Sequence, residues 1–420
     1  MKKNIFYAQS GGVTPVINAT AAGLIDYLSK NRSSFGKLFV GKNGIAGALN
    51  EQLIDISKED PKELKKLIHT PGGAFGSCRI KLKDPIKNKK EFQRILEVFK
   101  AHNIGYFFYN GGGDSQDTSL KISNYCKEYG YNITCIGLPK TIDNDLPITD
   151  NCPGFGSVAK YIAISTYEAS LDVASMANSS TKVFLLEVMG RHAGWLAASA
   201  GVIRDSVSMP PHLILLPEVV FDEKKFLLKV KKTVKEYGYC VVVASEGIKN
   251  KNNKFIAASS TKDSFGHAHL GGVAPKLANI ITTKLSYKVH WAVSDYLQRA
   301  ARHIGSSVDV KQAYMVGYKA LEYAKKGIDG VMLTIKSKKT KKYQWEIKYT
   351  DLKKVANVEK GLPKNFITKD GYNITASCKK YIKNLIYGED YPPYKNGIPV
   401  YAKLKNILVK KKLKNFRVNL

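Results

Sequence analysis

Ile133-Thr-Cys-Ile-Gly-Leu-Pro-Lys-Thr-Ile-Asp-Asn-Asp145 is an apolar run followed at once by a polar cluster. The run Ile133 to Leu138 is typical of a buried strand. The cluster after it would then lie at the carboxyl end of that strand, where open α/β sheets bind their ligands. An ammonium beside two carboxylates suits phosphoryl transfer, because charge neutralisation and positioning do most of the catalytic work there. For this segment alone, a surface loop with a charge pair is an open alternative.

Strand, loop and helix alternate along the rest of the chain. The first predicted strand ends in the glycine turn Ser10-Gly-Gly12, and a later one ends in Gly111-Gly-Gly113. Such alternation predicts an α/β protein with parallel, doubly wound sheets. Besides 133–138, the predicted strands span 3–9, 38–41, 104–109, 182–188 and 240–245, with a hairpin at 329–335 and 343–349, and the predicted helices span 16–28, 90–102, 118–129, 158–176, 276–285, 293–302 and 311–325.

Length and composition limit the class of protein. At 420 residues the chain is longer than one average domain, so one large α/β unit or two lobes are expected. It contains no apolar stretch of about 18 residues and no signal-peptide pattern, which argues against a membrane span and for a cytoplasmic location. The six cysteines are scattered without metal-binding or CxxC spacing, which is typical of reduced thiols inside the cell.

The net charge of +31 has two competing explanations. One is a generally basic surface that attracts phosphorylated substrates. The other is a polyanionic partner, because clustered lysines give salt-sensitive binding to nucleic acids. The chain has neither a basic stripe interleaved with aromatic residues nor a recognition-helix motif, so we do not expect a nucleic-acid partner.

The two glycine turns are candidate phosphate sites. Glycine lets the backbone approach an anion closely, and the helix that follows offers its N–H groups and the positive end of its dipole. Ser10-Gly-Gly12 and Gly111-Gly-Gly113 both precede a predicted helix. The chain lacks the GxxxxGK[ST] pattern, which excludes a P-loop enzyme, and its first turn lacks the GxGxxG pattern of nicotinamide-dependent enzymes.

Charged side chains near the strand ends complete this picture. Asp114 could bind Mg²⁺, which prefers one or two carboxylates plus substrate phosphates, or it could cap the following helix. Arg79 and Lys81, which follow another pair of glycines, could neutralise a phosphate. Arg191 could orient a phosphorylated ligand or form a structural salt bridge.

Three residues near position 300 suggest a phosphate clamp. Arg299 and Arg302 are three residues apart in a predicted helix and so share one face, as do Tyr296 and Arg299. Two guanidinium groups on one face suit bidentate binding of a phosphate.

Taken in sequence order, these clusters resemble the phosphofructokinase family over roughly residues 3–325. Each motif is short, but five or six of them in this order are specific. The resemblance implies an α/β fold of two Rossmann-like lobes with parallel-rich sheets and an active site in the cleft between them. The motifs are Ser10-Gly-Gly12 with Asn18, Gly111 to Ser115, Thr141-Ile-Asp143 with Asp145, Met189-Gly-Arg191, Glu246, and Gly266-His267 before Gly271-Gly272.

The resemblance implies roles for individual residues. Asp143 would be the general base that takes the proton from the sugar 1-hydroxyl. Mg²⁺ is the implied cofactor; Gly113 stands where relatives have a metal-binding aspartate, which leaves Asp114, Asp143 or Asp145 as candidate ligands, and Asp114 is our choice. The residues expected to bind fructose 6-phosphate are Thr141, Ile142, Asp143, Met189, Gly190, Arg191, Glu246, Tyr296 and Arg299, and those expected at the phosphoryl donor are Gly11 and Arg79.

Two positions indicate which donor is used. Relatives that use ATP have glycine at the position of Asp114, whose carboxylate would repel and obstruct an α-phosphate. They also have a small residue at the position of Lys140, whose ammonium could stabilise the leaving phosphate when the donor is pyrophosphate. The chain therefore resembles the pyrophosphate-dependent branch, with Asp114, Lys140 and Asp143 as catalytic residues. An ATP-dependent phosphofructokinase of the same fold is the alternative.

The resemblance also suggests an organisation. Residues 1–141 and 250–300 would form the donor lobe, 142–249 and 301–350 the sugar lobe, and 351–420 a basic extension whose place the sequence pattern does not predict. We expect a homodimer or homotetramer. Leu270 replaces an arginine that contacts phosphate in allosteric relatives, so we expect a non-allosteric enzyme.

Overall fold

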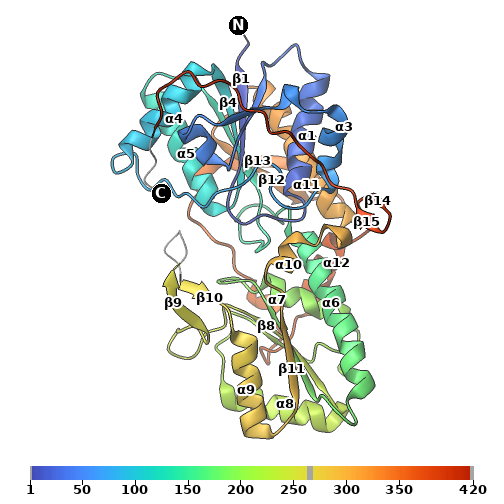
Figure 1. The fold of residues 1–420 in the computed structure, drawn as a ribbon. Coiled ribbons are helices and arrows are strands. Elements are labelled where there is room, and N and C mark those ends of the chain that lie inside the picture. Colours follow the sequence, from blue (N-terminus) through green and yellow to red (C-terminus); the bar gives the residue numbers. More distant parts are fainter. Residues whose placement is uncertain (1, 263–267, 417–420) are drawn as a thin grey trace.

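The computed structural model describes residues 2–262 and 268–416 of the chain. It has two lobes, each built around a β-sheet with helices on both faces (Figure 1). The predicted α/β fold of two parallel-rich lobes is confirmed. Gly266 and His267, which contributed to the family resemblance, lie outside the described residues. Among the residues that the structure describes, no helix is both long enough and apolar enough for a membrane span.

The first lobe contains a seven-stranded sheet. Its five inner strands are parallel, and the two edge strands are antiparallel to their neighbours. Strand β2 lies on one side of β1, and β4, which follows later in the chain, lies on the other side. The strand order therefore reverses between β1 and β4, and sheets of this kind bind ligands at such a switch point. The strand order is β13 (Trp345–Asp351), β12 (Val331–Ser337), β5 (Thr134–Pro139), β4 (Ile104–Gly111), β1 (Asn4–Gln9), β2 (Leu38–Gly41) and β3 (Leu53–Asp55).

Two helix layers cover this sheet. Alternate residues of β1 face opposite layers, since Ile5 packs into one hydrophobic cluster and Phe6 into another. On the first face, α1 and α11 are in such close contact that a Cβ added to Gly23 would lie 1.9 Å from the carbonyl oxygen of Tyr314. The helices on this face are α1 (Ile17–Lys30), α3 (Pro61–Lys66) and α11 (Ser307–Lys325), and those on the other are α2 (Ile45–Leu49), α4 (Lys89–Ala101) and α5 (Gly113–Glu128).

The second lobe contains a four-stranded, fully parallel sheet. The strand order is β11 (Val289–Val293), β6 (Val183–Val188), β8 (Cys240–Ser245) and β7 (Leu213–Leu215). The helices of this lobe are α6 (Phe155–Met176), α7 (Trp195–Ser199), α8 (Glu223–Tyr237), α9 (Val273–Leu285) and α10 (Asp295–Ala300), and a hairpin is formed by β9 (Ala258–Lys262) and β10 (Ala268–Leu270).

The structure corrects the predicted exchange of segments between the lobes. The range 250–300 was assigned to the donor lobe, but its strand β11 pairs with β6 of the second sheet. The range 301–350 was assigned to the sugar lobe, but β12 pairs in parallel with β5 of the first sheet, and β13 completes that edge. An apolar pattern identifies a strand without identifying its neighbour, which is why the sequence did not reveal this arrangement.

The C-terminal extension contacts both lobes. Its helix α12 (Ala376–Leu385) packs on α6 of the second lobe through Cys378, Ile382 and Leu385. The chain then returns along the first lobe as an extended segment, drawn in red in Figure 1. There the backbone N–H of Asp55 donates to the carbonyl of Ile407 (3.0 Å). The extension therefore ties the lobes together.

Arg302 contributes to this tie, which corrects the prediction that it joins a phosphate clamp. Helix α10 ends at Ala300, and the side chain of Arg302 is fully buried. Its guanidinium donates to the carbonyl of Ile68 (3.2 Å) and pairs with the carboxylate of Asp390 in the extension. Because the helix ends at Ala300, Arg302 does not share a helix face with Arg299. Its side chain instead joins Ile68 to Asp390 in the interior of the protein.

His212 makes the stability of the second lobe depend on pH. Burial lowers the pKa of His212 from 6.5 to about 4. Its Nδ1 accepts the N–H of Val241 (3.0 Å), and its buried Nε2 has no hydrogen-bond partner among the residues that the structure describes. In the unfolded chain this imidazole has its ordinary pKa of 6.5, so it takes up a proton at a higher pH than in the folded protein. The free energy of unfolding therefore decreases as the pH falls below 6.5.

We expect the free energy of unfolding to fall by about 2 kcal/mol between pH 7 and pH 5 from His212 alone. Denaturant unfolding of wild type and His212→Asn at both pH values measures this effect. The asparagine keeps an acceptor but does not titrate, so its pH dependence should be weaker. Equal pH dependence in the two proteins would contradict the prediction.

Candidate active site

A cavity of about 860 Å³ lies between the two lobes at the carboxyl ends of their strands. It is the position that the topology of the first sheet predicts for a ligand. Most of the predicted site residues meet there, although they come from seven separate segments of the chain. The predicted residues that line it are Gly11, Arg79, Asp114, Lys140, Thr141, Ile142, Asp143, Met189, Arg191, Glu246, Tyr296 and Arg299.

The first wall is the glycine turn after β1. Gly11 has a φ of +69°, which favours glycine, and its N–H donates to the carbonyl of Cys78 (2.9 Å). The ammonium of Lys140, directly after β5, donates to the carbonyl of Gly12 (2.7 Å). A Cβ on Gly12 would lie 3.3 Å from the guanidinium carbon of Arg299, so a side chain there would displace that cation.

Lys140 is the buried cation of the cavity. Only 4 % of it is exposed, and burial lowers its pKa to about 8, with the charges of Arg299 and Arg79 acting in the same direction. Asp143 opposes this shift. A bound polyanion would favour the charged ammonium, because opposite charges at short range stabilise the ionised form. The group is therefore suited to binding an anion.

Asp143 and Asp145 place two carboxylates in the acidic loop after Lys140, and both line the cavity. Burial raises the pKa of Asp143 to about 7, and the charges of Asp145 and Glu246 add to this shift. Burial also raises the pKa of Asp145, and its buried Oδ1 has no hydrogen-bond partner within the described part of the chain. The N–H of Asp143 donates to Oγ1 of Thr141 (3.0 Å), which fixes the turn. A carboxylate that titrates near neutral pH can serve as a general base.

The second lobe contributes the ends of β6 and β8. Burial raises the pKa of Glu246, which directly follows β8, to about 7, while the nearby Arg191 lowers it. The N–H of Glu246 donates to the carbonyl of Val188 (2.9 Å). Gly190 has a φ of +124°, which favours glycine, and its carbonyl accepts from the hydroxyl of Ser245. Gly190, predicted to bind the sugar, does not line the cavity; it shapes the turn that carries Met189 and Arg191.

Arg299 reaches from α10 of the second lobe to the glycine turn of the first. Its guanidinium lies over the ring of Tyr296, 4.3 Å from the centroid, and beside Gly12. Burial is the main cause that lowers the pKa of Arg299, and the charges of its neighbours have smaller effects. The predicted pairing of Tyr296 with Arg299 on one helix face is therefore confirmed, and both residues line the cavity between the lobes.

Asp114 and Lys81 form an ion pair at the start of α5. The ammonium of Lys81 lies 2.6 Å from Oδ1 of Asp114, and both side chains line the cavity. Asp114 occupies the first turn of the helix, where the helix dipole stabilises a negative charge. Its carboxylate therefore stays at this end of the cavity.

Sequence reasoning missed one wall of the cavity. Asn357, Val358 and Glu359 of the C-terminal extension line it together with the predicted residues. Oε2 of Glu359 lies 3.0 Å from Nδ1 of His192, which directly follows Arg191. These three residues show no motif or periodicity, so their position became evident only in the folded chain.

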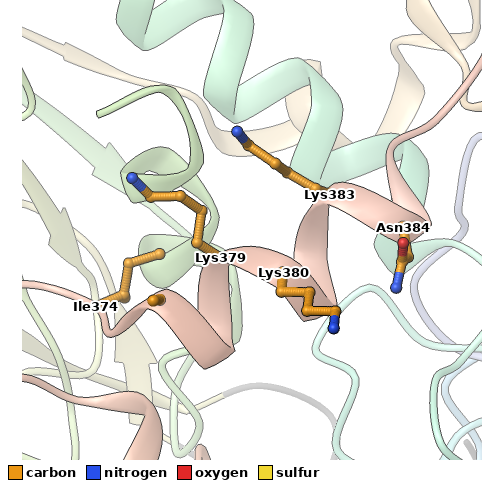
Figure 2. A pocket seen from close by; sticks show the side chains of 6 residues that line it. Ile374, Lys379, Lys380, Lys383 and Asn384 are labelled. Atoms are coloured by element: carbon orange, nitrogen blue, oxygen red, sulfur yellow. The ribbon is translucent and has the colours of Figure 1, made fainter. Parts of the chain in front are cut away.

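A second hollow, of about 510 Å³, lies on α12 and differs in character. Figure 2 shows that its lysines do not converge, because Lys379 and Lys383 point one way and Lys380 points another. Lys379 and Lys383 each lie 3.8 Å from Oδ1 of Asp205. With its lysines diverging and partly neutralised, this hollow is a weaker candidate than the cavity between the lobes.

The comparisons with known proteins agree with this geometry. The family model described as Phosphofructokinase matches residues 4–324. A curated protein from Halomonas elongata, named pyrophosphate--fructose 6-phosphate 1-phosphotransferase, is 54 % identical over 99 % of both chains. One of the same name from Methylococcus capsulatus is 54 % identical over 98 % of both. The crystal structure of a pyrophosphate-dependent phosphofructokinase from Marinobacter aquaeolei is 55 % identical, with a TM-score of 0.91 over 99 % of this chain and all of that one. The chain belongs to the phosphofructokinase family.

Proposed function

We propose that this protein transfers a phosphoryl group from pyrophosphate to the 1-hydroxyl of fructose 6-phosphate, giving fructose 1,6-bisphosphate and phosphate. The observation that carries the proposal is that one cavity contains both Lys140, buried against the glycine turn, and Asp114, at the start of α5. The names of the relatives that are more than half identical over almost the whole chain support the same activity.

In the proposed reaction, Asp143 accepts the proton of the sugar 1-hydroxyl. The oxygen then forms a bond to the nearer phosphorus of pyrophosphate, and the bond from that phosphorus to the bridging oxygen breaks. The bond's electrons stay with the departing phosphate. A base whose pKa lies near the working pH is the most effective, and the pKa of Asp143, raised to about 7 by burial, satisfies this condition.

The donor end of the cavity would bind pyrophosphate through the first lobe. The turn at Gly11 would let the backbone approach the phosphates closely, and Arg79 and Lys140 supply positive charge to the same cavity. Lys140 would stabilise the charge that develops on the leaving phosphate, since a fixed ammonium in a site shielded from water needs no reorganisation. Asp114 would exclude an α-phosphate by repulsion, which makes ATP the less suitable donor.

The sugar end would bind fructose 6-phosphate through residues of both lobes. Arg191 and Arg299 supply the guanidinium groups that suit its phosphate, and Glu246 offers a carboxylate to its hydroxyls. The remaining residues proposed for this end are Thr141, Ile142, Asp143, Met189, Gly190 and Tyr296; Gly190 would act through the turn that it shapes.

The carboxylates of the acidic loop fit the Mg²⁺ ion that the family resemblance implies. Asp145 has a buried carboxylate oxygen without a hydrogen-bond partner in residues 2–262 and 268–416, and it lines the cavity together with Asp143. Asp114, our sequence-based choice, is paired with Lys81 and is therefore the weaker candidate. We propose that Asp145 would hold Mg²⁺, which leaves Asp143 to act as the base. When bound, the ion would neutralise charge on the donor phosphates.

The remaining parts of the proposal concern context. We propose a cytoplasmic homodimer or homotetramer without allosteric control and without a nucleic-acid or membrane partner. The described cysteines are all free thiols, and most of them are buried. The basic surface would attract the two phosphorylated substrates.

A donor assay tests the proposal. We expect wild-type protein with Mg²⁺ to phosphorylate fructose 6-phosphate with pyrophosphate and to show very little turnover with ATP. The product is measured by a coupled assay for fructose 1,6-bisphosphate, and the reverse reaction by release of fructose 6-phosphate from the bisphosphate and phosphate. A preference for ATP would favour the ATP-dependent alternative, and no turnover with either donor would remove the proposal.

A further inference from the structure

A short segment of the C-terminal extension forms one wall of the active-site cavity. We call residues 357–359 the tail wall. All three of its residues line the cavity, although they lie beyond residue 324, where the match to the family model ends. The wall therefore comes from a part of the chain that lies outside that match.

The tail wall is fastened at both ends. At one end, Nδ2 of Asn357 donates to Oδ1 of Asp117 on α5 (3.0 Å). Asn357 has a φ of +58°, a conformation that asparagine adopts more readily than most residues. At the other end, the N–H of Lys360 donates to the carbonyl of Asp145 (2.6 Å), and the carbonyl of Lys360 accepts from Nε1 of Trp195 (3.1 Å). The wall is thus held to α5, to the acidic loop and to the second lobe.

The hydrogen bond between Asn357 and Asp117 lies close to Asp114, the residue proposed to select the donor. Asp114 and Asp117 are three residues apart and share one face of α5. Lys81 contacts this face through Asp114 (2.6 Å), and Lys121 donates both to Asp117 (2.5 Å) and to the carbonyl of Lys83. The segment 81–83 and the tail wall therefore both contact the first turns of α5, around Asp114.

The side chains of the tail wall are unsuited to binding a further phosphate. Val358 is 46 % exposed and offers no hydrogen bond, in a cavity lined mainly by charged and polar groups. Glu359 adds a carboxylate to the lining of the same cavity. A donor that extends beyond two phosphates near Asp114 would meet an apolar side chain and additional negative charge.

We propose that the tail wall, held in place by Asn357, limits the phosphoryl donor to pyrophosphate by closing the cavity beside Asp114 against a third phosphate or a nucleoside. The inference rests on the proposed function, because it concerns the donor of that reaction. It makes Asn357 and Val358 residues that determine specificity together with Asp114, and it predicts that removal of the Asp114 carboxylate alone opens the site only in part.

The experiment compares three donors, pyrophosphate, tripolyphosphate and ATP, in Asp114→Gly, Asp114→Gly/Asn357→Gly and Asp114→Gly/Val358→Ala. Glycine keeps the backbone conformation at 357 and removes the bond to Asp117, whereas alanine at 358 lowers the wall and leaves the bond intact. We expect each second substitution to raise the ratio of kcat/KM for tripolyphosphate to that for pyrophosphate by roughly 10- to 100-fold over Asp114→Gly alone. ATP should gain in the same direction.

Asn253→Gly is the matched control, because Asn253 has the same φ of +58°, is exposed and does not line the cavity. It should leave the donor ratio unchanged in the Asp114→Gly background. Calorimetric titration with tripolyphosphate gives a second readout that needs no turnover, and binding should tighten in both wall variants. Unchanged ratios and unchanged binding in both of them, or an equal gain in the control, would overturn the inference. If the wild type did not use pyrophosphate, the proposed function would fail, and the titration would still test the wall.

Discussion

Replacing Asp143 with asparagine should lower kcat with pyrophosphate by roughly 10²- to 10⁴-fold, which is the usual contribution of a general base. Asparagine has nearly the same shape but cannot accept the proton of the sugar hydroxyl. Since the effect is on the chemical step, KM for fructose 6-phosphate should change much less than kcat. Steady-state kinetics with saturating pyrophosphate and Mg²⁺ measures both quantities.

Asp172→Asn provides the control, because Asp172 is exposed on α6 and does not line the cavity. Its kinetics should match those of the wild type. Circular dichroism and thermal unfolding should show that Asp143→Asn remains folded; its free energy of unfolding should not fall, because burial raises the pKa of Asp143 and makes its charged form costly. If Asp143→Asn kept more than about a tenth of the wild-type kcat, Asp143 would not be the base.

Lys140→Met should reduce turnover with pyrophosphate by roughly 10²- to 10³-fold, the usual loss when a preorganised electrostatic contact is removed. Methionine fills most of the volume of the buried lysine but carries no charge. The glycine turn also loses the hydrogen bond from the ammonium to the carbonyl of Gly12 (2.7 Å). We expect kcat/KM for pyrophosphate to fall more than the affinity for fructose 6-phosphate.

Lys160→Met separates this effect from a general loss of stability. Lys160 is also buried and also donates to a backbone carbonyl, that of Gly388 (2.8 Å), but it does not line the cavity. Both variants should unfold at a somewhat lower temperature than the wild type, whereas only Lys140→Met should lose activity with pyrophosphate. An equal loss of activity in the two variants would show that Lys140 acts through stability alone.

The sequence alone predicted much of the candidate site because its residues follow strands. Gly11, Lys140 and Glu246 each come directly after an apolar run, and the carboxyl ends of parallel strands meet at one edge of a sheet. The local pattern of the sequence therefore indicated each strand and also that the polar residues after it lie at the carboxyl edge of the sheet. The antiparallel hairpin of β12 and β13 was also predicted, because alternating residues indicate strands regardless of their partners.

Other features depended on which segments meet in the folded chain. Arg302 has the spacing of a clamp residue, yet the helix ends before it and a buried position beside Asp390 holds its charge. Lys81 was predicted near a phosphate, and its ion pair with Asp114 follows from how the segment 79–83 lies against α5. No periodicity encodes such contacts, since they join residues that are far apart in the chain.

For this protein, the order of strands, glycine turns and acidic loop was determined by the sequence alone, because each of them is a local pattern of apolar, flexible and charged residues. The tertiary structure alone decided that β11 belongs to the second sheet and β12 to the first, and that Asn357 lines the cavity with its side chain bonded to Asp117. The physical reason is that strand pairing and wall contacts depend on which edges and faces remain available once the two sheets have formed.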